Sequence, residues 1–183
     1  IKIDEEFINE CLSKRRPSGN GETKRVELDN YKIISGVFNG YTTGSSICIL
    51  IENNNTKSKD YESIKDLARP SHVDYVANEK YHGFNDYRGG GHFSGRLTAP
   101  LCFAGAVCMQ ILEDMGVDVQ AHILSIKDVK DEKFNSIKIE KLEIGKKEFP
   151  VINDDKGNEM KEEIEKARLM GDSVGGVIEC AIT

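Results

Sequence analysis

The sequence predicts an α+β protein, because it contains both helical and strand-like patterns within 183 residues. Apolar residues at helical spacing, with capping and stop residues at the ends, predict helices over 4–14, 97–115 and 158–170. Apolar runs bounded by turn residues predict strands over 31–38, 46–51, 117–126, 137–144 and 174–183. This length suits one domain with a core of its own, and we expect residues 1–183 to form a single domain.

The first predicted helix carries its own start and stop signals. Asp4 suits the N-cap position, and acidic residues follow it at the positive end of the helix dipole. Arg15 and Arg16 come after the last turn, and Pro17 opens a loop. These two arginines are candidate ligands for an anion, although solvated arginines at a helix end are the commoner arrangement.

Residues 52–96 are mostly polar, with one short helix expected near 61–67. The six aromatic residues of this segment argue against disorder. A segment of this length without strong periodicity that is not disordered is usually functional.

The helix predicted over Leu97–Met115 is the most apolar in the chain. Pro100 stands in its first turn, where the missing N–H costs least, and Gly116 suits the position after its end. Because the run from Ala99 to Leu112 is nearly all apolar or small, we expect this helix to be buried on most sides.

Three consecutive glycines, Gly89–Gly91, stand shortly before this helix, with Arg88, His92, Ser94 and Arg96 around them. A bare backbone beside such side chains, leading into a helix N-terminus, suits a loop that binds an anion or a cofactor. The alternative is a flexible surface linker, which is the commoner reason for a run of glycines.

Composition excludes several classes of function. The net charge of −6 and the pI near 5.3 argue against non-specific binding of nucleic acid. No apolar run approaches the roughly 20 residues of a membrane-spanning helix. The five cysteines lack Cys-x-x-Cys spacing and read as buried free thiols of a reducing cytoplasm. His72, His82 and His92 are spaced ten residues apart, which matches no pattern of metal ligands, so we expect no metal site.

His72 is the candidate for proton transfer. It lies in the segment Arg69-Pro70-Ser71-His72-Val73-Asp74, where the proline disfavours helix at the residue before it. A histidine in a loop is a suitable general acid or base near neutral pH. The alternative is a structural histidine held by hydrogen bonds, which for an isolated residue is the commoner case.

In chain order, the segments resemble the chorismate synthase family. The resemblance lies in Lys14-Arg15-Arg16-Pro17 and in residues 34–44, 51–53, 58–61, 64–75, 86–96, 104–106 and 171–176. It implies a β-α-β sandwich, a homotetramer and a cytoplasmic enzyme that acts on a small molecule. The implied reaction is the 1,4-anti elimination of phosphate from 5-enolpyruvylshikimate 3-phosphate, giving chorismate. Reduced FMN is the implied cofactor, and NADPH as its reductant is left open.

Site residues carry over position by position. His72 matches the family's histidine associated with protonating the reduced flavin. His92, Phe93 and Ser94 occupy the place of a triplet that contacts FMN, which is Arg-Ser-Ser in many members, so only Ser94 is retained. Arg15, with Arg16, and Arg96 match positions that contact the substrate or NADPH. The arginine often found shortly after Pro17 has no clear counterpart here, and Lys24 or Arg25 are candidates to replace it.

The resemblance also implies missing parts. The family's N-terminal segment, with a second active-site histidine, would precede Ile1, and the C-terminal half would follow Thr183. We therefore expect residues 1–183 to be an incomplete and inactive piece of the enzyme. The alternative is a non-catalytic module that binds a flavin or an anion through the same loop.

Overall fold

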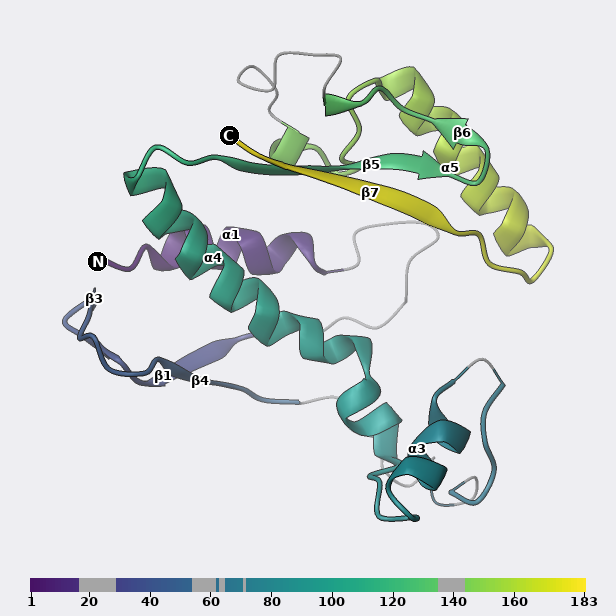
Figure 1. Ribbon diagram of the computed structural model, residues 1–183, viewed down its shortest axis with the longest axis horizontal. Coiled ribbons are helices and arrows are strands. Elements are labelled where there is room, and N and C mark those ends of the chain that lie inside the picture. The colour runs from purple at the N-terminus through teal and green to yellow at the C-terminus, as the bar shows by residue number, and fades with distance from the viewer. Residues whose placement is uncertain (17–28, 54–61, 63–64, 71, 135–143) are drawn as a thin grey trace. The chain divides into compact units, whose positions relative to one another are not determined.

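The computed structural model describes residues 1–16, 29–53, 62, 65–70, 72–134 and 144–183. The chain divides into two compact units, Ile1–Arg16 with Val26–Val107, and Pro17–Arg25 with Cys108–Thr183. Helices and strands occur in both units, so the prediction of an α+β protein is confirmed (Figure 1). A single domain over residues 1–183 stays a prediction.

The first unit opens with helix α1 (Glu5–Lys14), as predicted. The Asp4 carboxylate accepts a hydrogen bond from the backbone N–H of Phe7 at 3.0 Å, which satisfies one of the unpaired donors of the first turn. Arg15 takes the C-cap position at the other end. The helix therefore begins and ends where its capping residues place it.

The strand predicted over 31–38 is divided in two. Strand β1 (Tyr31–Ser35) pairs antiparallel with β4 (Cys48–Ile51), whereas β2 (Val37–Phe38) pairs with β3 (Tyr41–Thr42) around the turn Asn39-Gly40. The break falls at Gly36, which has φ of +86°. A Cβ there would lie 2.6 Å from the Cα of Ile47, so only glycine fits at this crossing.

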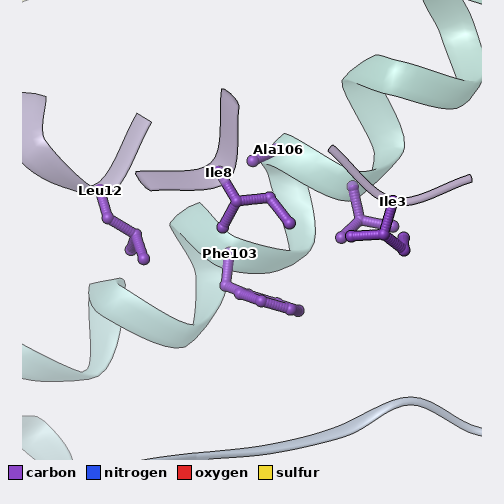
Figure 2. Packing of buried hydrophobic residues seen from close by; sticks show 6 residues of the cluster. Ile3, Ile8, Leu12, Phe103 and Ala106 are labelled. Atoms are coloured by element: carbon purple, nitrogen blue, oxygen red, sulfur yellow. The ribbon is translucent and has the colours of Figure 1, made fainter. Parts of the chain in front are cut away.

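Helices α1 and α4 (Thr98–Asp114) meet in the core of the first unit (Figure 2). Ile8 and Leu12 of α1 are 0% and 1% exposed, and Phe103 and Ala106 of α4 are 4% and 1% exposed. Ile3, just before α1, and Val107 of α4 complete the cluster, and the inner faces of β1 and β4 pack against it. Burial of these side chains is the main apolar contribution to the stability of this unit.

The outer face of α4 is exposed, so the prediction of a helix buried on most sides is wrong. Leu101 is 70% exposed, and the buried residues of the helix are Ala99, Phe103, Ala106 and Val107. The apolar segment is also longer than expected: within the described residues, Gly95–Asp114 is long and apolar enough to cross a membrane. That is weak evidence for a membrane, because the core helix of a soluble protein passes the same test.

The segment predicted as polar loop contains short helices. They are α3 (Asp74–Lys80) and the 3₁₀ helices η1 (Arg88–Phe93) and η2 (Gly95–Leu97), the last of which runs into α4. Of the helix predicted near 61–67, residues 61, 63 and 64 lie outside the described residues; Glu62 is helical, and 65–67 form a turn and a bend. The three glycines are therefore part of a helical turn rather than an irregular linker.

The second unit is a three-stranded antiparallel sheet with one long helix against it (Figure 1). Strand β5 (Val119–Ile126) is central, between β6 (Val129–Lys130) and β7 (Gly176–Ile182). These strands confirm two of the predicted runs. The strand predicted over 137–144 falls outside the described residues except at Ile144, which begins the 3₁₀ helix η5 (Ile144–Lys146).

Helix α5 (Asp154–Leu169) begins earlier than the predicted range 158–170. Asn153 is its N-cap, and the side-chain oxygen accepts from the backbone N–H of Asp155 at 2.9 Å and of Lys156 at 3.3 Å. The prediction missed this start because the first helical turn is acidic and polar, with no apolar periodicity. Acidic residues are nevertheless favourable there, next to the positive end of the helix dipole.

A buried histidine holds the polar core of the second unit. The His122 side chain is 0% exposed, with Nδ1 3.3 Å from Asp131 Oδ2 and Nε2 3.0 Å from Glu179 Oε2. The backbone N–H of Phe134 also donates to Glu179, at 2.9 Å, and the hydrogen bond from His122 is the main cause that lowers the pKa of Glu179. The pair joins β5 to β7, where His122 and Glu179 stand opposite each other.

The cysteines are free thiols, as predicted, but none of them is fully buried. Cys48, Cys108 and Cys180 are exposed, and Cys11 and Cys102 are partly buried. All five are free thiols. The prediction of buried thiols was wrong because the apolar runs around them lie on helices and strands with one open face.

We predict that Leu12→Ala lowers the free energy of unfolding of residues 1–183 by about 2–5 kcal/mol, because it leaves a cavity between α1 and α4. The matched control is Leu101→Ala, the same change at a position that is 70% exposed, with an expected effect within about 0.5 kcal/mol. Urea titrations followed by circular dichroism measure both. Equal losses at the two positions would contradict the described core.

A second prediction concerns the stability of the second unit in acid. Because the pKa of Glu179 is lowered in the folded chain, its stabilising contribution is present above about pH 4.3 and is lost as the pH falls through the folded value. Glu179→Gln should therefore cost about 1–3 kcal/mol near neutral pH and progressively less in acid. Urea titrations at several pH values measure this, with Glu162→Gln at an exposed position of α5 as the control. A loss of unfolding free energy in Glu179→Gln that does not change with pH would show that the ionised Glu179 carboxylate does not stabilise the unit.

Candidate functional site

The segment before α3 folds back on itself around Asp74. Pro70 follows Arg69, and the backbone N–H of His72 donates to the carbonyl of Arg69 at 3.3 Å, which closes a turn. The Asp74 carboxylate, in the first turn of α3, accepts from the backbone N–H of Arg69 at 3.0 Å. The turn thus brings Arg69, His72 and Asp74, which are close in sequence, to one place.

Arg69 and Asp74 form a two-pronged ion pair. Arg69 Nε lies 2.7 Å from Asp74 Oδ2, and Arg69 Nη2 lies 2.8 Å from Asp74 Oδ1. A planar guanidinium that donates to both carboxylate oxygens fixes their orientation as well as adding attraction. The side-chain hydrogen bonds from Arg69 are the main cause that holds the pKa of Asp74 well below its ordinary value.

His72 lies against this pair. Its Nδ1 is 2.5 Å from Asp74 Oδ1, and Arg69 Nη2 is 3.1 Å from the same ring nitrogen. The His72 side chain is 29% exposed, so part of the ring faces solvent. The arrangement can hold an imidazole in one orientation while leaving it accessible for proton transfer.

A cavity of about 360 Å³ opens beside the ion pair. Arg69 and Asp74 line one part of it, and Tyr75 and Asn78 of α3 and Tyr87 line another. Its volume lies within the usual range of small-molecule sites, and its walls mix aromatic and polar groups. The two partners of His72 therefore border space for a small ligand, although His72 itself does not line this cavity.

The predicted cofactor loop forms a second group. His92 and Phe93 lie with ring centroids 3.9 Å apart, and Tyr81, at the end of α3, meets the His92 ring edge-on at 5.5 Å. Ser94 is the N-cap of η2, and its hydroxyl oxygen accepts from the backbone N–H of Arg96 at 3.3 Å. The rings tie the glycine turn to α3, and Ser94 caps the turn that leads into α4.

Arg88, also beside the glycines, is engaged elsewhere. Its Nε and Nη2 donate to the two carboxylate oxygens of Asp86 at 2.8 Å and 2.9 Å, on an exposed surface. The hydrogen bonds from Arg88 lower the pKa of Asp86. This ion pair has the same two-pronged geometry as that of Arg69 and Asp74, but no described histidine contacts it.

Arg15 and Arg16 follow α1. Arg15 Nη2 lies 3.2 Å from Asp29 Oδ1, and the Asp29 carboxylate is only 5% exposed. Among the described residues, the buried Nε of Arg15 has no hydrogen-bond partner, so this guanidinium retains a donor for a further group. The described contacts do not join Arg15 or Arg16 to the group around His72.

The structure thus brings His92, Phe93 and Ser94 together and places His72 with two residues to which the sequence assigned no role, Arg69 and Asp74. The signal for them was present, because an acidic residue two positions after a histidine can reach its ring. Within the part of the chain that the structure describes, no group of histidine, cysteine and acidic side chains is arranged to hold a metal ion.

Comparisons with known proteins agree across the chain. The family model of chorismate synthase matches residues 1–183. The chain is 46% identical over 180 residues to a chorismate synthase of Pyrococcus abyssi, with 98% of this chain and 49% of the relative covered. It is 43% identical over 183 residues to one of Korarchaeum cryptofilum, with 98% of this chain and 50% of the relative covered.

A crystal structure of chorismate synthase has a similar fold, with a TM-score of 0.65 and 28% identity, over 99% of this chain and 49% of that one. The prediction of an α+β fold of this type is therefore confirmed. The chain spans about half the length of the curated relatives that it matches.

Proposed function

Because the chain belongs to the chorismate synthase family, we propose that it takes part in eliminating phosphate from 5-enolpyruvylshikimate 3-phosphate to give chorismate, a step in aromatic amino acid biosynthesis. The observation that carries the proposal is the match of the family over residues 1–183. Because the chain spans about half of its relatives, residues 1–183 supply one part of the enzyme and are inactive alone.

His72 is the residue that we propose for proton transfer. Its ring is partly exposed, Nδ1 lies against Asp74, and Nε2 has a longer contact of 3.4 Å with Arg69 Nη2. A histidine held in this way can transfer a proton through Nε2 without turning its ring. This supports a general acid–base role at the flavin or the substrate.

Arginines suit the remaining chemistry, since the substrate carries a phosphate and carboxylates. Arg15, Arg16 and Arg96 are proposed to bind these groups or NADPH. The buried Nε of Arg15, which has no hydrogen-bond partner among the residues that the structure describes, supports this, because a guanidinium binds an oxyanion through paired donors. Asp29 already orients the same guanidinium from one side.

The glycine turn fits a bound flavin by the chemistry of its residues. Ser94 accepts a hydrogen bond at its oxygen and still has its hydroxyl proton to donate to a phosphate or a ring carbonyl. Phe93 is 37% exposed, and its ring and that of His92 offer aromatic surface. Reduced FMN, when bound, supplies electron density to the reacting substrate. NADPH as its reductant, a homotetramer and a cytoplasmic location are further parts of the proposal.

The reaction is tested by anaerobic release of phosphate from 5-enolpyruvylshikimate 3-phosphate with reduced FMN. The full-length protein that contains residues 1–183 should release phosphate, and residues 1–183 alone should not exceed the background. Turnover by residues 1–183 alone would disprove the proposal that this part of the enzyme is inactive by itself. If the full-length protein binds oxidised FMN in a titration but releases no phosphate, the proposed enzymatic function is wrong, and the protein is a non-catalytic module that binds a flavin.

His72 is tested by changing two histidines in the same way. His72→Asn in the full-length protein should lower kcat by about 100-fold or more, since asparagine fills the place of the ring but transfers no proton. His82→Asn is the control, because His82 is exposed and has φ of +52°, a conformation that asparagine tolerates. Circular dichroism checks that both variants fold. An unchanged rate for His72→Asn would remove this residue from the mechanism.

A further inference from the structure

We propose that Asp74, held by Arg69, is the positioning residue that keeps a proton on Nδ1 of His72 and leaves Nε2 as the atom that transfers protons. This rests on the proposed role of His72 and adds to it the tautomer of the ring and the residues that set it. The contacts among the side chains of Arg69, His72 and Asp74 determine the tautomer.

The distance between Asp74 and His72 determines where the ring proton lies. Asp74 Oδ1 lies 2.5 Å from His72 Nδ1, which is a hydrogen-bond distance only if Nδ1 carries a hydrogen. An unprotonated Nδ1 would set its lone pair against a carboxylate oxygen at this distance, which is repulsive. The neutral ring therefore carries its proton on Nδ1 and its lone pair on Nε2.

Arg69 approaches the same nitrogen but cannot take the place of Asp74. Its Nη2 is 3.1 Å from His72 Nδ1, 3.4 Å from His72 Nε2 and 2.8 Å from Asp74 Oδ1. The longer contact suits a lone pair on Nε2, since an arginine N–H can only donate. Because Nδ1–H points to the carboxylate, the Arg69 donor is directed to that carboxylate as well, and its charge lies beside the ring. Arg69 thus keeps Asp74 ionised and oriented, while its charge offsets part of the attraction of Asp74 for a protonated ring.

The donors around Asp74 also predict what an amide would do there. Arg69 Nε and the backbone N–H of Arg69 both donate to Oδ2, at 2.7 Å and 3.0 Å. The described contacts give Oδ1 one arginine donor, Arg69 Nη2, at 2.8 Å. In Asp74→Asn the amide oxygen is therefore favoured at the Oδ2 position, where it keeps two donors and loses one, and this turns the NH₂ group toward His72 Nδ1. An NH₂ donor requires a lone pair on Nδ1, so the ring proton moves to Nε2 and the wrong tautomer results.

The experiment measures the tautomer and the rate separately, in the full-length protein labelled with ¹⁵N-histidine. Two-bond ¹H–¹⁵N spectra at about pH 9, where an ordinary imidazole is neutral, should show the proton of His72 on Nδ1 in the wild type. They should show it on Nε2 in Asp74→Asn. In the same variant kcat should fall about tenfold or more, with KM for the substrate within about twofold.

Two further variants separate positioning from a general loss of structure. Glu165→Gln removes a carboxylate that Arg168 holds by the same fork on α5, at 2.6 Å and 2.5 Å, and should change neither the tautomer nor kcat. Arg69→Lys keeps the charge but loses the fork, and should lower kcat with the Nδ1 proton retained.

The outcomes distinguish this inference from the proposed function. A wild-type His72 with its proton on Nε2, or Asp74→Asn with the wild-type kcat, would overturn the positioning role even in an active enzyme. A wild-type protein that shows the Nδ1 proton and the tautomer change in Asp74→Asn, but makes no chorismate, would refute the proposed function and leave the geometry supported.

Discussion

The packing of α1 on α4 is the constraint on which two groups of candidate ligands in the first unit depend, the arginines after α1 and the glycine turn before α4. Ile8 and Leu12 meet Phe103 and Ala106 on a narrow stripe, and the strands β1 and β4 close over it. Arg15 and Arg16 follow directly after α1, and the glycine turn with Ser94 leads directly into α4. Both sets of candidate ligands are thus attached to the ends of the two helices that the core holds together.

Carboxylates organise the parts that the apolar core does not reach. Asp29 orients Arg15, Asp74 joins Arg69 to His72, and in the second unit Glu179 joins β7 to His122. Each of these carboxylates is at least half removed from water and has a charged or hydrogen-bonded partner, as burial of charge requires. The loops are therefore fixed by directed bonds, which set orientation more sharply than apolar contact does.

Elements with local capping and periodic burial could be predicted from the sequence, and the others could not. Helix α1 and strands β5 and β7 were predictable because their patterns are long and bounded by suitable residues. Helix α3 was missed because it has seven residues and one buried side chain, Ala77, too little for a period to appear. The open face of α4 was missed because composition reports how apolar a helix is, not how much of the chain covers it. His122 was missed because its partners come from β7 and from the residue that follows β6, which no local pattern joins.

The two arginine forks of the first unit explain why motif and geometry are both needed to assign a site. Asp86 with Arg88 and Asp74 with Arg69 share the same two-pronged bond and the same backbone N–H contact. Within the described part of the chain, the second has a histidine within reach, two residues before the carboxylate, and its two members line the cavity, whereas Asp86 and Arg88 do not. Arg69, His72 and Asp74 lie within five residues of one another, so a single turn of backbone determines the geometry of these three side chains. Such a group can be set before the rest of a binding site is assembled around it, which suits a residue that must present the same ring nitrogen in every turnover.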